Sequence, residues 1–393
     1  MRPWLGVLIA SAVLVGSACT APASPSASAF PSAPASPSAP AAPGSAQVPG
    51  ATTSRAAGGT GGPIAVTDAL GRQVTFPAAP RRIVIAGKTD FVIADAAFLF
   101  PEARSRVVAI GRPGQNWLRF LPVIDPQSAQ ITILDTGAGP EQIAASHPDA
   151  VLMTSSNART LGGPLAALGV PVVYVDFETP SDYTRDLGIL GTVFTDPARA
   201  QQLVAFFQGQ VARVTGPLAG LGESQKPSIL LLYYNDANGA VSFNVPPLSF
   251  IQSSEAQLAG GRLAWKDAEL GQGWTTVSFE QIAAWNPDQI YLIAYFNSAT
   301  EVVRSLKANP QWAALHAVQQ GQIYAFPGDY ISWDEPDPRW VLGLTWLATK
   351  MHPDAFTGLD MTAEIRTFYR DLYGLDAAAY ASQIAPRLTG DLP

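Results

Sequence analysis

Polar and basic side chains follow several short apolar segments in the first half of this sequence. Such apolar segments, alternating with helical periods, predict parallel strands, and ligands bind beyond the carboxyl ends of parallel strands. Lys88 and Arg112 at such ends favour a ligand that carries negative charge. The full set of candidate ligand-binding residues from this half is Lys88, Arg112, Trp117, Ser155 and Ser156, with Asn116 and Asn157 beside them.

The second half of the sequence supplies mainly aromatic residues at the equivalent positions. Its candidates are Tyr234, Asn235, Trp274, Phe296, Asn297, Tyr330 and Trp333, with Tyr295 beside them. Aromatic walls with a few polar groups are typical of sites for bulky, partly apolar ligands. We therefore predict one ligand site, with residues from both halves around it.

Several of these residue types also have structural interpretations. Four tryptophans recur on helical periods, which favours burial in the core: Trp265, Trp285, Trp312 and Trp346. Tyr330 and Trp333 lie in a Gly- and Asp-containing loop, where ligand contact and core burial both stay open. Asp334 and Glu335 are interpreted as surface charges, and Asp337 as a helix cap.

Catalytic and metal-binding patterns are absent from the sequence. It contains no Gly-x-Ser-x-Gly segment and no Gly-x-x-x-x-Gly-Lys segment. Its three histidines are scattered and it has one cysteine, so we expect neither a protein-built metal site nor a cofactor. The formal net charge of -7 argues against a nucleic-acid partner, because phosphate binding requires a basic face. We therefore expect a binding protein rather than an enzyme.

The N-terminus predicts export. Arg2 precedes an apolar run from Trp4 to Val15, and small residues then lead to Cys19, the only cysteine. This order is typical of a signal peptide, here residues 1–18. The position of Cys19 resembles that of the acylated cysteine of bacterial lipoproteins, although Gly16 replaces the usual leucine. Simple cleavage after Ala18 is the alternative.

Residues 19–62 are predicted to form a lipidated cysteine followed by a tether. The segment consists almost wholly of Ala, Pro, Ser, Gly and Thr. It cannot bury enough apolar surface to offset the entropy of ordering, so it is predicted to be disordered. The protein is thus expected outside the cytoplasm, anchored to the cell membrane by lipid.

The remaining sequence contains an internal repeat. Residues 141–153 and 280–292 both begin with Glu-Gln-Ile-Ala-Ala and continue through a Pro-Asp turn into an apolar segment. Each predicts a short helix, a turn and a buried strand. The fold class is therefore α/β, with two Rossmann-like lobes and a ligand cleft between them. The predicted boundaries are 63–180 for the N-terminal lobe, 181–222 for a linker helix region and 223–393 for the C-terminal lobe.

Two long helices are predicted in addition to the repeat. Asp196 as cap and Pro197 as first residue begin a helix that runs towards Leu218 and joins the lobes. A single helix in this place predicts a rigid connection. A last amphipathic helix is expected from Arg339 to Met351.

The order of several segments resembles helical-backbone solute-binding proteins of ABC importers. The segments are Val66–Phe76 with Pro80–Val84, Leu168–Asp176, Trp333–Trp340, Leu342–Ala348 and Phe368–Gly374. Members of this family carry iron chelates, haem, vitamin B12 or molybdate, and they dock to the permease through one glutamate on each lobe. The resemblance implies this role for Glu301. The comparable first-lobe position holds Asn157-Ala-Arg159, without a glutamate.

The sequence as a whole thus predicts an extracytoplasmic, monomeric substrate-binding component that delivers a ligand to an ABC permease. A ferric siderophore-type chelate is the first expectation for the ligand. Molybdate or tungstate, a corrinoid and haem are alternatives within the same fold. A surface adhesion or scaffold lipoprotein is an alternative of another class.

Overall fold

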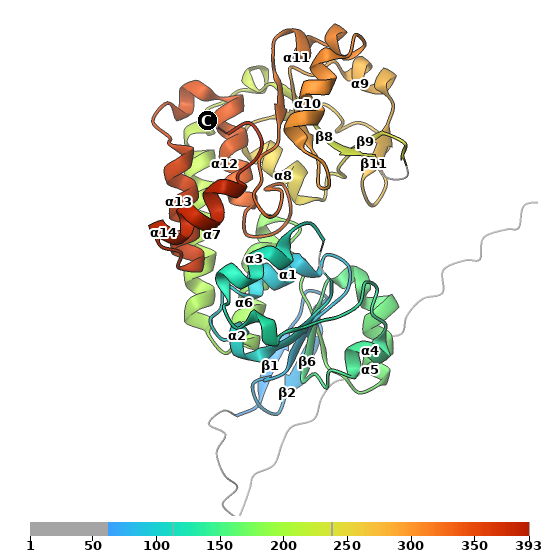
Figure 1. Ribbon diagram of the computed structural model, residues 1–393, viewed down its shortest axis with the longest axis vertical. Coiled ribbons are helices and arrows are strands. Elements are labelled where there is room, and N and C mark those ends of the chain that lie inside the picture. The colour runs from blue at the N-terminus through green and yellow to red at the C-terminus, as the bar shows by residue number, and fades with distance from the viewer. Residues whose placement is uncertain (1–61, 113, 237–238, 393) are drawn as a thin grey trace, which may run out of the picture. The chain divides into compact units, whose positions relative to one another are not determined.

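A computed structural model describes residues 62–392 apart from residues 113, 237 and 238 (Figure 1). The predicted signal peptide, Cys19 and nearly all of the tether lie outside the described residues. The described chain contains two separate central sheets, one from each half of the sequence, connected by one long helix. Within the described residues, no helix combines the length and apolar character needed to span a membrane.

The first lobe is built on a five-stranded parallel sheet with strand order β5-β4-β3-β6-β7. Its central strand β3, Ile83–Ile85, is fully buried, as expected for a β-branched segment covered on both faces. The other strands are β4 (Val107–Ile110), β5 (Thr132–Ile133), β6 (Ala150–Met153) and β7 (Val172–Tyr174), and a hairpin of β1 (Ile64–Thr67) and β2 (Gln73–Phe76) precedes them. The helices are α1 (Asp90–Ala97), α2 (Ala103–Arg106), α3 (Trp117–Ile124), α4 (Pro140–Ala144), α5 (Gly163–Ala167) and α6 (Pro180–Val193).

The second lobe is built on a mixed sheet with strand order β11-β9-β8-β12-β13, and β10 also pairs with β8. Strands β8, β12 and β13 are parallel, whereas β9 and β11 are antiparallel additions at one edge. The strands are β8 (Ser228–Asn235), β9 (Ser242–Val245), β10 (Arg262–Leu263), β11 (Thr275–Val277), β12 (Gln289–Ile293) and β13 (Ile323–Ala325). The helices are α8 (Ile251–Leu258), α9 (Phe279–Trp285), α10 (Ala299–Ala308), α11 (His316–Gln319), α12 (Trp340–Met351), α13 (Met361–Tyr373) and α14 (Ala377–Ala379).

The repeated sequence segments form equivalent units in the two lobes. In the first lobe α4 leads into β6, and in the second α9 leads into β12. His147 and Asn286 both have positive φ before the Pro-Asp turn, with φ of 49° and 40°. The turn aspartates also act alike: Asp149 accepts the backbone N–H of Arg82, and Asp288 accepts that of Ser228. The predicted common construction of the two lobes is confirmed.

Helix α7, Pro197–Leu218, is the predicted connection. Its cap is as expected, because the Asp196 side chain accepts the backbone N–H of Arg199 at 2.9 Å. The guanidinium of Arg199 donates to the carbonyl of Leu99 in the first lobe and to that of Leu372 in α13. These bonds fix the helix to both parts of the chain, which is consistent with a rigid link.

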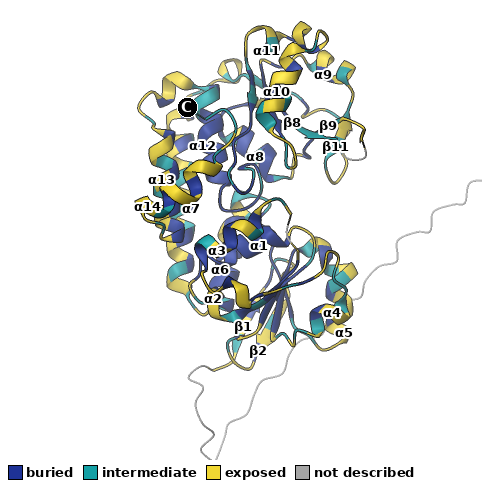
Figure 2. Cartoon of the chain, viewed as in Figure 1, coloured by how far each residue is buried: buried dark blue, intermediate teal, exposed yellow. Residues whose placement is uncertain are grey.

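The helix that was expected from Arg339 to Met351 forms as α12, but it is neither amphipathic nor the last helix. α12 begins at Trp340 and is buried along most of its length, as Figure 2 shows, because α7, α8 and α13 all pack against it. It is also followed by α13, which carries the C-terminal aromatic residues onto the core. A helix enclosed on several sides needs apolar residues around most of its circumference, and this explains its high content of Trp and Leu.

Candidate functional site

The principal cavity of the first lobe has a volume of about 710 Å³ and lies at the carboxyl ends of its parallel strands. Residues that follow β3, β4, β5 and β6 contribute to its wall, as the sequence predicted for strand exits. Its lining includes Gly87, Lys88, Thr89, Asp90, Gly111, Arg112, Gly114, Asp135, Thr136, Ser156, Asn157 and Thr160.

The loop after β3 is held in place by Asn157. Its Oδ1 accepts the backbone N–H of Lys88 at 3.2 Å, and its Nδ2 donates to Thr154 Oγ1 at 2.6 Å. Gly87 has φ of 115°, and a Cβ at this position would lie 2.8 Å from the Asn157 side chain. Only glycine therefore allows this close contact, which fixes the backbone that carries Lys88.

The charges around the cavity are mixed. Lys88 and Arg112 are exposed, and so is Asp135, whose carboxylate accepts from Gln142 at 2.8 Å. Asp90, the first residue of α1, is only 4% exposed. Burial raises the pKa of Asp90 to about 7, although the backbone N–H of Phe91 partly opposes the shift. The cavity thus combines two exposed cations with one buried and one exposed carboxyl group.

The strand ends of the second lobe carry an aromatic cluster. The ring of Tyr233 lies 5.3 Å from that of Trp274 and 4.6 Å from that of Tyr295. Phe296, the next residue, is 76% exposed. The neighbouring Tyr234 packs edge-on against Phe243. Trp274, Tyr234 and Phe296 are among the predicted ligand-binding residues, whereas Tyr233 is not.

A second cavity of about 170 Å³ includes residues from both lobes. Gln115 and Asn116 line it from the first lobe, and residues after β12 and β13, such as Asn297 and Ser332, line it from the second. Gln115 accepts the backbone N–H of Ser332 at 2.9 Å and donates to Glu335 at 2.6 Å. The backbone N–H of Asn116 donates to the Tyr330 carbonyl at 3.1 Å. The loop that contributes Arg112 and Gly114 to the first cavity is therefore bonded directly to the second lobe.

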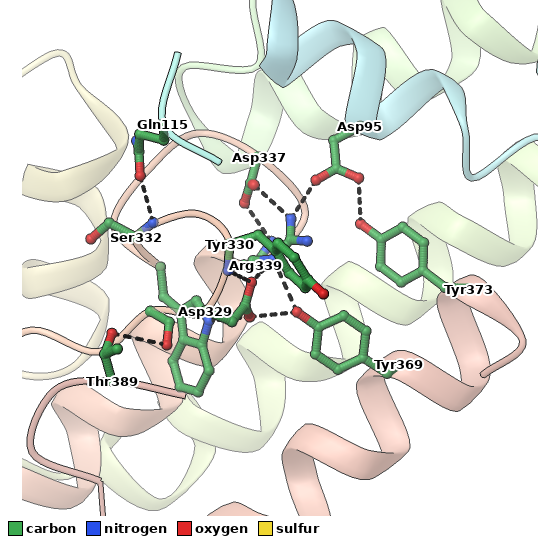
Figure 3. Close-up of polar contacts among 12 residues, drawn as sticks. Asp95, Gln115, Asp329, Tyr330, Ser332, Asp337, Arg339, Tyr369, Tyr373 and Thr389 are labelled. Carbon is green, nitrogen blue, oxygen red and sulfur yellow. Dashed lines mark hydrogen bonds and ion pairs between the residues drawn. The ribbon is translucent and has the colours of Figure 1, made fainter. Parts of the chain in front are cut away.

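The loop before α12 is positioned by a buried ionic network (Figure 3). Arg339 is completely buried and pairs with Asp95 of α1, with Asp337 at 2.8 Å and with Asp329 at 2.9 Å. Tyr369 donates to Asp329, and Tyr373 donates to Asp95 at 2.7 Å. Because the partners come from α1, α13 and the loop, the network joins the first lobe to the C-terminal helices.

Carboxyl groups without a cation accumulate next to this network. Glu255 of α8 is fully buried, and neither of its carboxyl oxygens has a hydrogen-bond partner. Burial, reinforced by Asp334, Asp337 and Glu335, raises the pKa of Glu255 well above its usual range. Asp334 is also fully buried and accepts from Ser332 and Tyr295. The expectation that Asp334 is a surface charge is therefore wrong, because its loop folds inward against α8.

The Asp337 prediction is corrected in detail. Its Oδ1 accepts the backbone N–H of Arg339, immediately before α12, so its carboxylate does satisfy a backbone donor there. Its Oδ2 binds the Arg339 side chain, which makes it part of the buried network rather than a simple cap. Within the described residues, no group of three or more His, Cys, Asp or Glu side chains is arranged to bind a metal ion.

Three of the predicted ligand-binding aromatics are enclosed by the protein. Trp117 and Trp333 have no exposed surface, and Tyr330 is 4% exposed. Trp333 donates to Asp329 at 2.9 Å, and Tyr330 donates to the Gln383 carbonyl at 2.9 Å. The structure corrects the expectation of an open wall at Trp117 and Trp333, because both indoles fill the core. Tyr330 borders the second cavity, as does Asn297.

The remaining predicted residues are distributed as follows. Lys88, Arg112 and Ser156 come together at the first cavity, while Ser155 donates its backbone N–H to Asp176 and lies outside that lining. Trp265, Trp312 and Trp346 are buried as predicted, and Trp285 packs partly against the core. Asn235 ends β8. Glu301 is exposed in the first turn of α10 and pairs with Arg304.

Sequence reasoning missed Asp90 and Gln115. Asp90 follows the end of β3 by five residues, so it could have been included among the residues that follow strands. Gln115 gave no signal, because its role depends on a contact with residues more than 200 positions later.

Two α/β lobes, a rigid connecting helix and cavities at the strand ends together define a bilobal solute-binding protein. Residues 125–330 match the periplasmic binding protein family, and the chain belongs to this family. Members of the family are solute-binding proteins rather than enzymes. The chain is thus a substrate-binding component of an ABC transporter that acts outside the cytoplasm.

The chain is similar to two characterised proteins with different ligands. It is 21% identical over 333 residues to the molybdate-binding protein MolA of Haemophilus influenzae, covering 78% of this chain and 90% of MolA. It is 26% identical over 191 residues to the vitamin B12-binding protein of Pectobacterium carotovorum, covering 45% of this chain and 64% of that protein. The structure of Helicobacter pylori CeuE with Ni(II) bound has a TM-score of 0.65 at 19% identity, covering 82% of this chain and 99% of CeuE.

Proposed function

We propose that the protein captures an anionic metal chelate of the ferric siderophore type and delivers it to the permease. The main support is the 710 Å³ cavity with Lys88 and Arg112 on its wall, together with the exposed Phe296 at a strand end of the second lobe. A volume of this size accommodates a whole small-molecule ligand. Basic side chains then bind its negative charge, while aromatic rings cover its apolar parts.

Molybdate or tungstate is the second candidate. Its support is the relative MolA, which binds molybdate. A bare oxyanion needs only a few convergent donors, whereas the first cavity, at about 710 Å³, is much larger than such an ion requires. A corrinoid is the third candidate, supported by the vitamin B12-binding relative, and haem is the fourth.

The ligand is identified by purification from native membranes followed by absorbance spectroscopy and elemental analysis. Thermal melts of the emptied protein then compare ferric catecholates, ferric hydroxamates, molybdate, tungstate, cyanocobalamin and haemin. A ligand present at 100 times its Kd adds about 2.7 kcal/mol of stability. We expect iron in the native material and stabilisation by a ferric chelate. Stabilisation by molybdate alone, or by no member of the panel, contradicts the proposed ligand.

The proposal includes anchoring through acylated Cys19, which lies outside the described residues. Two or more acyl chains give stable membrane attachment, whereas one gives only marginal binding. Mass spectrometry of the membrane-extracted protein should find the lipid mass on Cys19, and Cys19→Ala should release the protein. An unmodified cysteine in native material contradicts the anchor.

The proposal also assigns permease docking to Glu301. Its carboxylate is exposed, and its only charged partner among the described residues is Arg304 on the same helix, so it can exchange that partner for a basic residue of a permease. Glu301→Arg should reduce uptake in cells while ligand binding in solution is unchanged. Wild-type uptake with this variant contradicts the assignment. We propose that the protein acts as a monomer, which light scattering of the purified protein checks.

A further inference from the structure

The proposed function assigns no role to Asp90. It lines the first cavity, yet its side chain is almost completely buried against the backbone of Gly111. A Cβ at Gly111 would lie 1.9 Å from Asp90 Oδ2, so the glycine makes the space that the carboxyl group occupies. Within the described residues Asp90 forms no ion pair. The cavity therefore has a buried hydrogen-bonding group that no protein cation neutralises.

The charged groups around Asp90 come from three strand exits. Lys88 belongs to the loop after β3, Arg112 follows β4, and Asp135 follows β5. The residues after β6, Ser156, Asn157 and Thr160, are polar but uncharged. Lys88, Arg112 and Asp135 are exposed, whereas Asp90 is buried at the cavity wall. A ligand that fills this part of the cavity therefore meets a carboxyl group that is shielded from solvent.

We propose that Asp90 determines ligand specificity by selecting a ligand that carries a hydrogen-bond donor, such as a hydroxyl or amide N–H, beside its anionic groups. An ionised carboxylate accepts hydrogen bonds only, so an anion with acceptors alone would place oxygen against oxygen in a buried place. A donor group on the ligand forms a charge-assisted hydrogen bond instead. This inference rests on the proposed function and narrows its ligand class.

The protonation state of Asp90 gives the proposal a second observable. With a pKa of about 7, raised by burial, the carboxyl group is mostly ionised at pH 8 and mostly protonated at pH 6. When protonated it can donate to an oxyanion. Discrimination against an acceptor-only anion is therefore strongest at pH 8 and weaker at pH 6.

The test is calorimetric titration of the full chain with two probes at both pH values. A ferric tris-catecholamide complex with glucosyl substituents is anionic and carries free hydroxyl groups, whereas molybdate is anionic and carries only acceptors. The variant is Asp90→Asn, which keeps the shape of the side chain. Asp135→Asn makes the same change of charge at the same cavity, and thermal melts of both variants report whether they fold.

We expect Asp90→Asn to reduce the preference for the catecholamide over molybdate roughly tenfold at pH 8 and much less at pH 6. Asp135→Asn should strengthen the binding of both probes alike and leave the ratio of their affinities unchanged. An unchanged ratio in Asp90→Asn, or an equal change in both variants, overturns the inference while leaving the proposed function intact. A wild-type chain that binds neither probe overturns the inference and rules out the catecholate form of the proposed ligand.

Discussion

Gln115 of the first lobe donates a 2.6 Å hydrogen bond to the Glu335 carboxylate of the second lobe. The other end of the same amide accepts the backbone N–H of Ser332 (Figure 3). Both polar groups of the Gln115 side chain thus bind residues of the second lobe. Gln115 has φ of 52°, a conformation that side-chain-bearing residues seldom adopt. The strained residue lies three positions after Arg112. The position of Arg112 and the contact between the lobes are thus linked through one short loop.

Removing the Gln115 side-chain amide should weaken the contact between the two lobes. We expect Gln115→Ala to increase hydrogen exchange at Ser332, whose N–H loses its acceptor, and at Asn116, whose bond to Tyr330 belongs to the same contact. Gln257→Ala, on the exposed side of α8, is the control. Unchanged exchange at both amides would show that the amide does not hold the lobes together.

Arg339 should be among the most important residues for stability. Its replacement by Met leaves three buried carboxylates, those of Asp95, Asp329 and Asp337, without their common cation. Loss of one partner from a buried ion pair costs about 3–5 kcal/mol. Arg213→Met breaks the exposed pair with Glu364 and should cost about 1 kcal/mol or less. Urea unfolding of the two variants measures the difference, and equal losses would argue against the network.

The folded chain should lose stability as the pH rises because of Glu255. The pKa of Glu255 in the folded state lies above its unfolded value of 4.5, so its neutral form is favoured by folding. Its contribution is fully present below pH 4.5 and is lost as the pH rises through the folded pKa.

Glu255→Gln should therefore raise the melting temperature at pH 8 more than at pH 5. Each kcal/mol regained corresponds to about 2–4 °C for a domain of 150–250 residues. Glu269→Gln, an exposed control, should leave the melting temperature unchanged at both pH values. A gain in Glu255→Gln that is equal at both pH values would contradict the account of this buried carboxyl group.

Trp333 and Phe296 should show opposite behaviour. Trp333 is fully buried, so Trp333→Ala should lower the free energy of unfolding by about 3–5 kcal/mol. Phe296 is 76% exposed, so Phe296→Ala should leave stability within about 0.5 kcal/mol and weaken ligand binding. Chemical unfolding and ligand titration separate the two effects. A stable Trp333→Ala variant with weakened binding would restore Trp333 to the ligand site.

The local patterns in the sequence predicted the fold well. The repeat, with its helix, turn and strand, and the Asp196 cap of α7 depend on neighbouring residues, and the structure has them in the predicted places. The cavity of the first lobe could also be predicted from local patterns, because Lys88, Arg112 and Ser156 each follow a strand segment.

The second-lobe loop could not be predicted in this way. Whether Trp333 and Asp334 face a ligand or the core depends on Arg339, Asp95 and α13, which are distant in sequence. A Gly- and Asp-containing segment usually indicates an exposed loop. Here buried ion pairs draw it inward, and no local pattern reports such partners.

The central claim is that ligand charge is bound at the first-lobe cavity, and calorimetric titration of Arg112→Gln tests it most directly. The experiment uses the ligand recovered from the native protein, with Arg104→Gln, an exposed arginine of α2, as the control. Loss of a hydrogen bond to a charged group costs about 1.5–3 kcal/mol, so Arg112→Gln should weaken binding at least tenfold. Arg104→Gln should bind as the wild type does. Equal affinities for the wild type and Arg112→Gln would contradict the claim and place the ligand elsewhere.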